Sequence, residues 1–158
     1  MKKILSYSIV ILILSFISLS AQSNEMDPAS AQFYNDGNKL LKAGDYQGAV
    51  TKYIEALKTS DDHRIHYQKG VAYKKMRKYS DAEASFTSCI KSNPNFGAGY
   101  NGLGGTFFVS GNYEKAIENY RKFVELSNKE SMKKSGNEAI AKCFFKLGES
   151  SKSDGKFE

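Results

Sequence analysis

Apolar and small residues recur along this chain in one pattern that appears three times. In each copy a glycine is followed twelve residues later by an alanine, and four residues after that by an aromatic residue. The three sets are Gly37, Ala49 and Tyr53; Gly70, Ala82 and Phe86; and Gly104, Ala116 and Tyr120. Bulky residues at intervals of three and four around each glycine form one face of a helix. The spacing of 33 and 34 residues between copies predicts stacked helical hairpins, because one hairpin cannot bury its own apolar face.

The glycines inside these helices predict close contacts. A glycine in a helix costs roughly 1 kcal/mol relative to alanine, so three at one register indicate an approach that a side chain would block. Gly44 and Gly111 fall between the two helices of the first and third copies, where glycine can adopt the left-handed conformation that ends a helix. Arg77 occupies that position in the second copy, where Ser80 and Glu83 are expected to form a capping box for the next helix.

The third copy carries a recognisable series of residues: Tyr100, Leu103, Gly104, Phe107, Gly111, Tyr113, Ala116 and Tyr120. This series resembles the tetratricopeptide repeat, a family of helical hairpins that stack into a solenoid. The resemblance implies an all-α tetratricopeptide solenoid over residues 30–148, with helix-turn-helix repeats at about 30–62, 63–96 and 97–130. A further helix at about 134–148 is expected to cap the solenoid at its C-terminal end.

The two ends of the chain have a different character from the repeats. Lys2 and Lys3 precede an apolar stretch that ends in small residues at Ala21, which is the layout of a secretory signal peptide over residues 1–21. The layout resembles a Gram-negative export signal, and it predicts a periplasmic or secreted protein with a short linker at 22–29. An uncleaved segment would instead anchor the protein in a membrane, still with the repeats outside the cytoplasm. Residues 149–158 are expected to form a polar tail.

Charge and glycine content argue against nucleic acid and nucleotide ligands. Removal of residues 1–21 leaves 21 basic and 17 acidic residues, a net charge of +4 that is too small and too interspersed for a nucleic-acid surface. Residues 97–102 match the glycine fingerprint of dinucleotide-binding proteins. That motif works only between a strand and a helix, whereas here it falls inside the first helix of the third copy.

The remaining reactive side chains do not predict an enzyme. His63 and His66 follow Asp61 and Asp62 with a spacing that could suit a metal, but we favour an aspartate cap and a packed His66. Histidine occurs only at these two positions, so no serine, cysteine or carboxylate pair has a catalytic partner, and no cofactor is expected. Cys89 and Cys143 lie about two repeats apart and are predicted to be buried, unpaired thiols.

The family resemblance implies that the first helices of the repeats line a concave groove. Its predicted residues are Tyr34, Asn38, Leu41, Arg64, Tyr67, Lys74, Lys75, Asn101, Phe108, Val109 and Phe145. Gly102 and Gly105 are expected on the same face. Family members that grip a terminal carboxylate use lysine, asparagine and arginine at five positions, of which only Asn38 is retained here. The other four positions hold Tyr34, Gln68, Ala98 and Gly102, so that clamp is absent.

Aromatic area bordered by lysines suits an extended or helical peptide with apolar anchors and some acidic character. The sequence therefore predicts a non-enzymatic interaction module or adaptor of the cell envelope, which binds a peptide or protein segment in its groove. The alternative is a structural subunit of an envelope assembly that stacks through its outer and terminal faces. Phe144 and Phe145, side by side in the unpaired fourth helix, favour that alternative.

Overall fold

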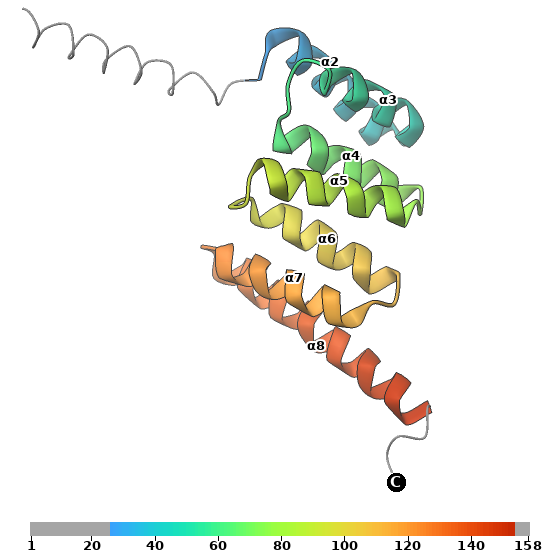
Figure 1. The fold of residues 1–158 in the computed structure, drawn as a ribbon, viewed down its shortest axis with the longest axis vertical. Coiled ribbons are helices and arrows are strands. Elements are labelled where there is room, and N and C mark those ends of the chain that lie inside the picture. The colour runs from blue at the N-terminus through green and yellow to red at the C-terminus, as the bar shows by residue number, and fades with distance from the viewer. Residues whose placement is uncertain (1–25, 154–158) are drawn as a thin grey trace, which may run out of the picture.

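A computed structural model describes residues 26–153, which form seven helices and no strand (Figure 1). The helices are α2 (Pro28–Ala43), α3 (Tyr46–Ala56), α4 (His63–Lys75), α5 (Tyr79–Ser92), α6 (Gly97–Val109), α7 (Tyr113–Leu126) and α8 (Glu130–Ser153). The expected signal peptide, residues 1–21, lies outside the described residues. Within residues 26–153, no helix is long and apolar enough to cross a membrane.

Consecutive helices pair as antiparallel hairpins that stack along the long axis of the molecule (Figure 1). The pairs α2 with α3, α4 with α5, and α6 with α7 each pack closely, and α8 packs along α7. Gly136 of α8 allows this approach, since it lies against Val124 and Phe123 of α7. The prediction of three hairpins with a terminal helix in an all-α solenoid is confirmed.

Two helices extend beyond the approximate limits expected from the sequence. Helix α2 begins inside the expected linker, because Asp27 accepts a hydrogen bond from the backbone N–H of Ser30 at 3.0 Å and Pro28 occupies the first turn. Helix α8 begins at Glu130 and continues to Ser153, through the first half of the expected polar tail. A polar sequence can remain helical when one face packs and the exposed face carries pairs such as Lys146 with Glu149, whose Nζ and Oε2 atoms are 2.7 Å apart.

The repeated glycines make room for aromatic rings: a side chain at these positions would be blocked, as predicted, but by a ring of the second helix and not by its backbone. In every hairpin the glycine of the first helix faces the aromatic residue of the second helix. The pairs are Gly37 with Tyr53, Gly70 with Phe86 and Gly104 with Tyr120. A Cβ atom added at Gly37 would lie 2.6 Å from Cε1 of Tyr53, and the closest distances at the other two glycines would be 2.8 Å and 3.0 Å. The obstacle is therefore a ring inserted between the helices.

All three hairpin turns use a residue in the left-handed conformation. Its φ angle is 86° at Gly44, 78° at Gly111 and 59° at Arg77. The predicted capping box at Ser80 was wrong, because the turn starts α5 at Tyr79 and leaves Lys78 at the N-cap without a side-chain cap. The turn geometry thus sets where α5 begins, and Ser80 falls inside its first turn.

Two clusters of buried side chains form a connected core. The first lies within α3 and the adjoining face of α4, and the second runs from α5 through α6 and α7 to α8. Tyr73 packs against both clusters. Cys89 and Cys143 are buried and not bonded to each other, as predicted.

Candidate functional site

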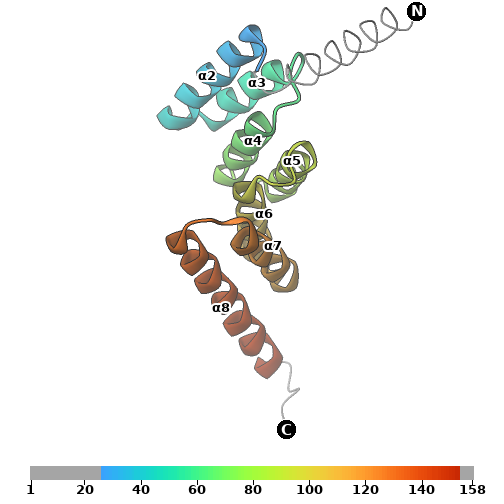
Figure 2. The same ribbon diagram turned by 90° about the vertical axis from the view of Figure 1, so that its left-hand side faces the viewer.

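Helices α2, α4, α6 and α8 form the inner surface of the solenoid. Helix α2 contacts α4 and α4 contacts α6, whereas no contact of similar extent joins α3 to α5 or α5 to α7 among the described helices. Figure 2 shows α2 and α8 extending to the same side of the stack, with α4 and α6 between them. The predicted groove residues all belong to this inner set of helices or to the residues at their ends.

The α2 end of this surface is committed to internal contacts. Asn38 accepts a hydrogen bond from the Tyr53 hydroxyl, with its Oδ1 atom 2.8 Å from the phenol oxygen. The ring of Tyr34 lies 6.2 Å from that of Tyr53, and Leu41 packs against the first core cluster. Burial, together with nearby Tyr34, raises the pKa of Tyr53 far above its ordinary value, so this phenol stays a donor. These side chains hold α2 on α3.

Arg64 and Tyr67, at the start of α4, also make contacts within the protein. Asp62 caps α4 by accepting the Arg64 backbone N–H at 2.7 Å, and it receives the guanidinium Nε of the same residue at 2.9 Å. Burial alone would raise the pKa of Asp62, but the hydrogen bonds from Arg64 outweigh it and the pKa is lowered. The Tyr67 ring centroid lies 5.7 Å from that of Phe86 and 5.4 Å from that of Phe96. Both predicted groove residues therefore support the fold.

The end of α4 carries a half-buried lysine without a counter-ion. No carboxylate lies within ion-pair distance of Lys74 in the part of the chain that the structure describes. Its Nζ atom would lie 2.9 Å from a Cβ added at Gly105, so the ammonium rests on α6 where that helix has no side chain. Burial lowers the pKa of Lys74, and the neighbouring charge of Lys75 lowers it further.

A cleft of about 410 Å³ opens between α6 and α8. We call it the α6/α8 cleft, and it is lined by Phe108, Ala141, Lys142, Phe145 and Lys146. The Phe108 ring meets Tyr113 edge-on at 5.6 Å, while Phe145 remains 65% exposed. The cleft exists because α8 packs along α7 and does not pack closely along α6.

The other predicted groove positions do not join this cleft. Asn101, Val109 and Lys75 are exposed and lie outside its lining. The expectation that Gly102 faces the groove was wrong, because a Cβ at that position would lie 2.5 Å from the Phe86 ring in the core. Gly105 lies beneath Lys74, so it meets the inner surface only through that side chain.

The two histidines have separate partners. His63 packs edge-on against Phe96 with ring centroids 4.7 Å apart, and His66 contacts the Asp61 carboxylate. Asp62 caps the helix, as expected. Among residues 26–153, no group of three or more histidine, cysteine or acidic residues could hold a metal ion.

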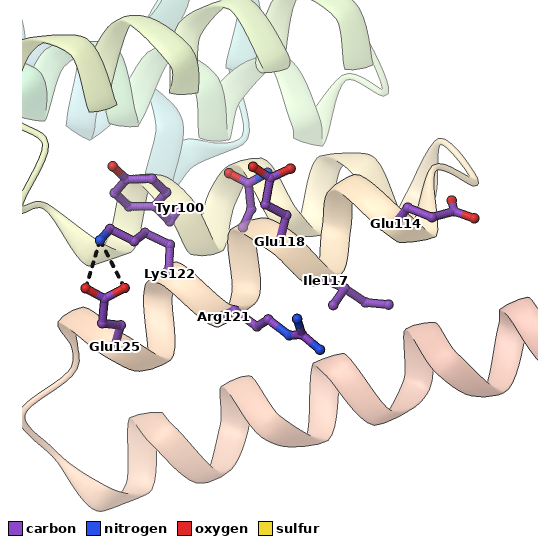
Figure 3. A pocket seen from close by; sticks show the side chains of 8 residues that line it. Tyr100, Glu114, Ile117, Glu118, Arg121, Lys122 and Glu125 are labelled. Atoms are coloured by element: carbon purple, nitrogen blue, oxygen red, sulfur yellow. Dashed lines mark hydrogen bonds and ion pairs between the residues drawn. The ribbon is translucent and has the colours of Figure 1, made fainter.

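A second hollow lies on the outer side of the solenoid (Figure 3). It measures about 460 Å³ and is lined by Tyr100, Glu114, Ile117, Glu118, Asn119, Arg121, Lys122 and Glu125. Lys122 and Glu125 pair with each other at 2.8 Å, and Figure 3 shows Arg121 and Ile117 extending from α7 toward α8. Its charges are of both signs, and Arg121, its one cation without an ion pair in the described part of the chain, is exposed, whereas Lys74 on the inner surface is half-buried.

Comparison with known proteins agrees with this architecture. Two models of the tetratricopeptide repeat match this chain, one over residues 63–96 and the other over residues 98–130. This chain is a tetratricopeptide-repeat protein. Its relatives include heat shock protein STI1 of Saccharomyces cerevisiae, 28% identical over 117 residues, which are 73% of this chain and 20% of STI1. Hsp70-Hsp90 organizing protein 3 of Arabidopsis thaliana is 30% identical over 135 residues, which are 84% of this chain and 24% of that protein.

Solved tetratricopeptide domains have the same fold. The Sgt2 domain from Aspergillus fumigatus superposes with a TM-score of 0.71 at 20% identity, over 80% of this chain and 83% of that one. The first such domain of Spaghetti (RPAP3), bound to an HSP90 peptide, superposes with a TM-score of 0.70 at 19% identity, over 80% of this chain and 98% of that one. The chain spans about a fifth to a third of the length of the first relatives that it matches, so the functions of those whole proteins do not transfer to it.

Sequence reasoning placed Phe108 and Phe145 on the inner surface of this tetratricopeptide array but did not assemble the cleft. Ala141 and Lys146 were absent from the predicted set. The sequence does indicate this part of the cleft, because Phe145 lies four residues after Ala141 and three after Lys142. Residues at these spacings share one face of a helix. That face lies opposite Cys143, which is buried against the core.

Proposed function

We propose that this chain is a non-enzymatic binding module that holds a peptide or protein segment along its inner surface. The observation that carries the proposal is the juxtaposition of the half-buried Lys74, which has no carboxylate within ion-pair distance among residues 26–153, with the open α6/α8 cleft. Similar domains support it, because one holds the HSP90 peptide SRMEEVD and another, TPR2B of yeast Sti1, is in complex with pHsp70.

The contacts must differ from those of domains that grip a terminal carboxylate. The corresponding positions here are occupied by Tyr34, Asn38, Gln68, Ala98 and Gly102, which supply no lysine or arginine. The Oδ1 atom of Asn38 already accepts the Tyr53 hydroxyl. The end of a peptide therefore has no cationic partner at these five positions.

A peptide library displayed on phage tests the proposal. Binders selected on the wild-type protein should lose binding to Phe108→Ala and to Phe145→Ala. They should still bind Phe144→Ala, which removes a neighbouring ring that is 52% exposed and lies outside the cleft. Circular dichroism and melting curves establish that each variant is folded. Binders that ignore both cleft substitutions would refute the proposed inner-surface role.

A structural role is the second candidate, and the exposed apolar side chains of α8 favour it. Phe144 is 52% exposed and Met132 is 43% exposed on this terminal helix. A partner subunit stacked on α8 would cover them. In that case Phe144→Ala should disrupt assembly, measured by size-exclusion chromatography with light scattering, while substitutions in the cleft should not.

We also propose that the protein is exported to the cell envelope. Support comes from the pattern of residues 1–21 alone, where two lysines precede an apolar stretch and small residues. N-terminal sequencing of the protein from an envelope fraction should find Gln22 as the first residue. Recovery of the chain from the soluble cytoplasm with Met1 intact would contradict export.

A further inference from the structure

We propose that the inner surface recognises an internal acidic segment, in which a carboxylate side chain pairs with Lys74 and a nearby large apolar side chain enters the α6/α8 cleft. This inference rests on the proposed function and specifies its ligand class.

The charge distribution of the inner helices supports an acidic partner. Helix α4 carries Arg64, Lys69, Lys74 and Lys75 and no acidic residue, and α6 carries no charged residue at all. Arg64 is compensated by Asp62, whereas Lys74 has no carboxylate within ion-pair distance among residues 26–153. A half-buried charge without a counter-ion is energetically costly. A ligand carboxylate that pairs with it should therefore contribute more binding free energy than a carboxylate that pairs with an exposed lysine. The lowered pKa of Lys74 agrees with this environment.

The lysine and the cleft are about one helical turn apart. The ammonium of Lys74 rests on α6 at Gly105, and Phe108 follows three residues later on the same helix. Positions three residues apart on a helix have Cβ atoms about 5–6 Å apart. An extended peptide rises about 3.3 Å per residue, so the acidic residue and the apolar anchor of the ligand should be about two residues apart.

The cleft itself suits one large apolar side chain. Phe108 and Phe145 come from different helices, and Ala141 between them contributes only a methyl group. Its volume of about 410 Å³ is within the range of roughly 300–1,000 Å³ typical of ligand pockets. Lys142, which has no ion-pair partner in the described part of the chain, borders the cleft and extends the positive surface.

The ligand segment should be internal because none of the five positions that grip a terminal carboxylate in related domains holds a lysine or arginine here. The lysine ammonium is a compact charge on a flexible side chain, so it can donate hydrogen bonds to a single side-chain carboxylate. Lys75 beside it is exposed, and Asn38 of α2 already accepts a hydrogen bond from Tyr53. A free C-terminal carboxylate on the peptide should therefore increase its affinity only slightly.

Synthetic peptides on a glycine-serine background provide the probe. Each is acetylated, amidated and fluorescein-labelled, and carries one glutamate and one phenylalanine separated by one to five positions. Fluorescence anisotropy at low salt should show the best binding when the two residues are two positions apart. Replacing the glutamate by glutamine, or the phenylalanine by alanine, should weaken binding about tenfold.

A matched pair of protein variants isolates the role of Lys74. Lys74→Met should weaken the glutamate peptide about tenfold and leave the glutamine peptide unchanged, because the coupling belongs to the ion pair. Lys69→Met removes an equally charged, half-buried lysine of the same helix, one that lies near Asp81, and should change binding less than twofold. Melting curves for both variants show whether folding is retained.

Three results would overturn the inference. One is an effect of Lys74→Met no larger than that of Lys69→Met, and another is glutamine peptides that bind as well as glutamate peptides. The third is a free-acid peptide that binds at least tenfold more tightly than its amide. If no synthetic peptide binds but displayed library peptides still require Phe108 and Phe145, the acidic ligand is wrong while the proposed function stands. Failure of both experiments refutes both proposals.

Discussion

Replacing Gly102 by alanine should destabilise the protein, because the ring of Phe86 occupies the space that the new methyl group needs. The added Cβ would lie 2.5 Å from Cε1, 2.7 Å from Cδ1 and 2.8 Å from Cζ of that ring. Phe86 is only 1% exposed, and the same ring also lies against Gly70, where a Cβ would be 2.8 Å from it. The ring is held between α4 and α6 and has little room to withdraw.

The magnitude follows from a comparison with Gly105→Ala in the same helix. Alanine gains about 1 kcal/mol of helix propensity over glycine at either position. At Gly105 the new methyl group would meet the Lys74 Nζ atom at 2.9 Å, the free end of a flexible side chain that can move aside. Overpacking a core costs about 1–3 kcal/mol. Gly105→Ala should therefore raise the free energy of unfolding by up to about 1 kcal/mol. The free energy of unfolding of Gly102→Ala should be about 1–3 kcal/mol lower than that of Gly105→Ala.

Urea and thermal unfolding followed by circular dichroism measure this difference. For a domain of this size, 1 kcal/mol corresponds to about 4 °C in Tm. Adding Phe86→Leu, which makes the core side chain smaller, should cost less in the Gly102→Ala background than alone, because it relieves the overlap. A Gly102→Ala protein at least as stable as Gly105→Ala would refute the inserted-ring explanation.

Three further predictions concern the turn, the histidine and the thiols. Arg77→Gly should stabilise the protein by about 1 kcal/mol, since a non-glycine residue is strained at a φ of 59°. Gly111→Ala should destabilise it by a similar amount, and urea unfolding curves measure both changes. Burial lowers the pKa of His63 below 6.5 despite the nearby Asp62 carboxylate, so the unfolded chain binds the proton more readily and stability should decline as pH falls from 6.5 toward the lower, folded pKa. The decline should be smaller in His63→Gln, and an equal decline would contradict the assignment. Burial raises the pKa of Cys89 to about 12 and also raises that of Cys143, so Ellman's reagent should label both thiols rapidly only after denaturation.

The sequence alone determined the repeat and its register. Helical periodicity, a glycine suited to a left-handed turn, and glycine, alanine and aromatic residues at fixed spacing can be read from the chain itself, so their recurrence at 33 and 34 residues was enough to predict the hairpins. The same local reasoning predicted Cys89 and Cys143 to be buried. It failed at Ser80, where the preceding turn determined the start of α5.

Only the tertiary structure decided which inner-surface residues are available to a ligand. Asn38 accepts a hydrogen bond from Tyr53 and the Tyr67 ring packs against Phe86, because different helices meet there. The α6/α8 cleft likewise depends on how α8 packs along α7 and diverges from α6. Helical spacing determines which residues share a face, whereas the crossing of neighbouring helices determines whether that face is buried, paired or open.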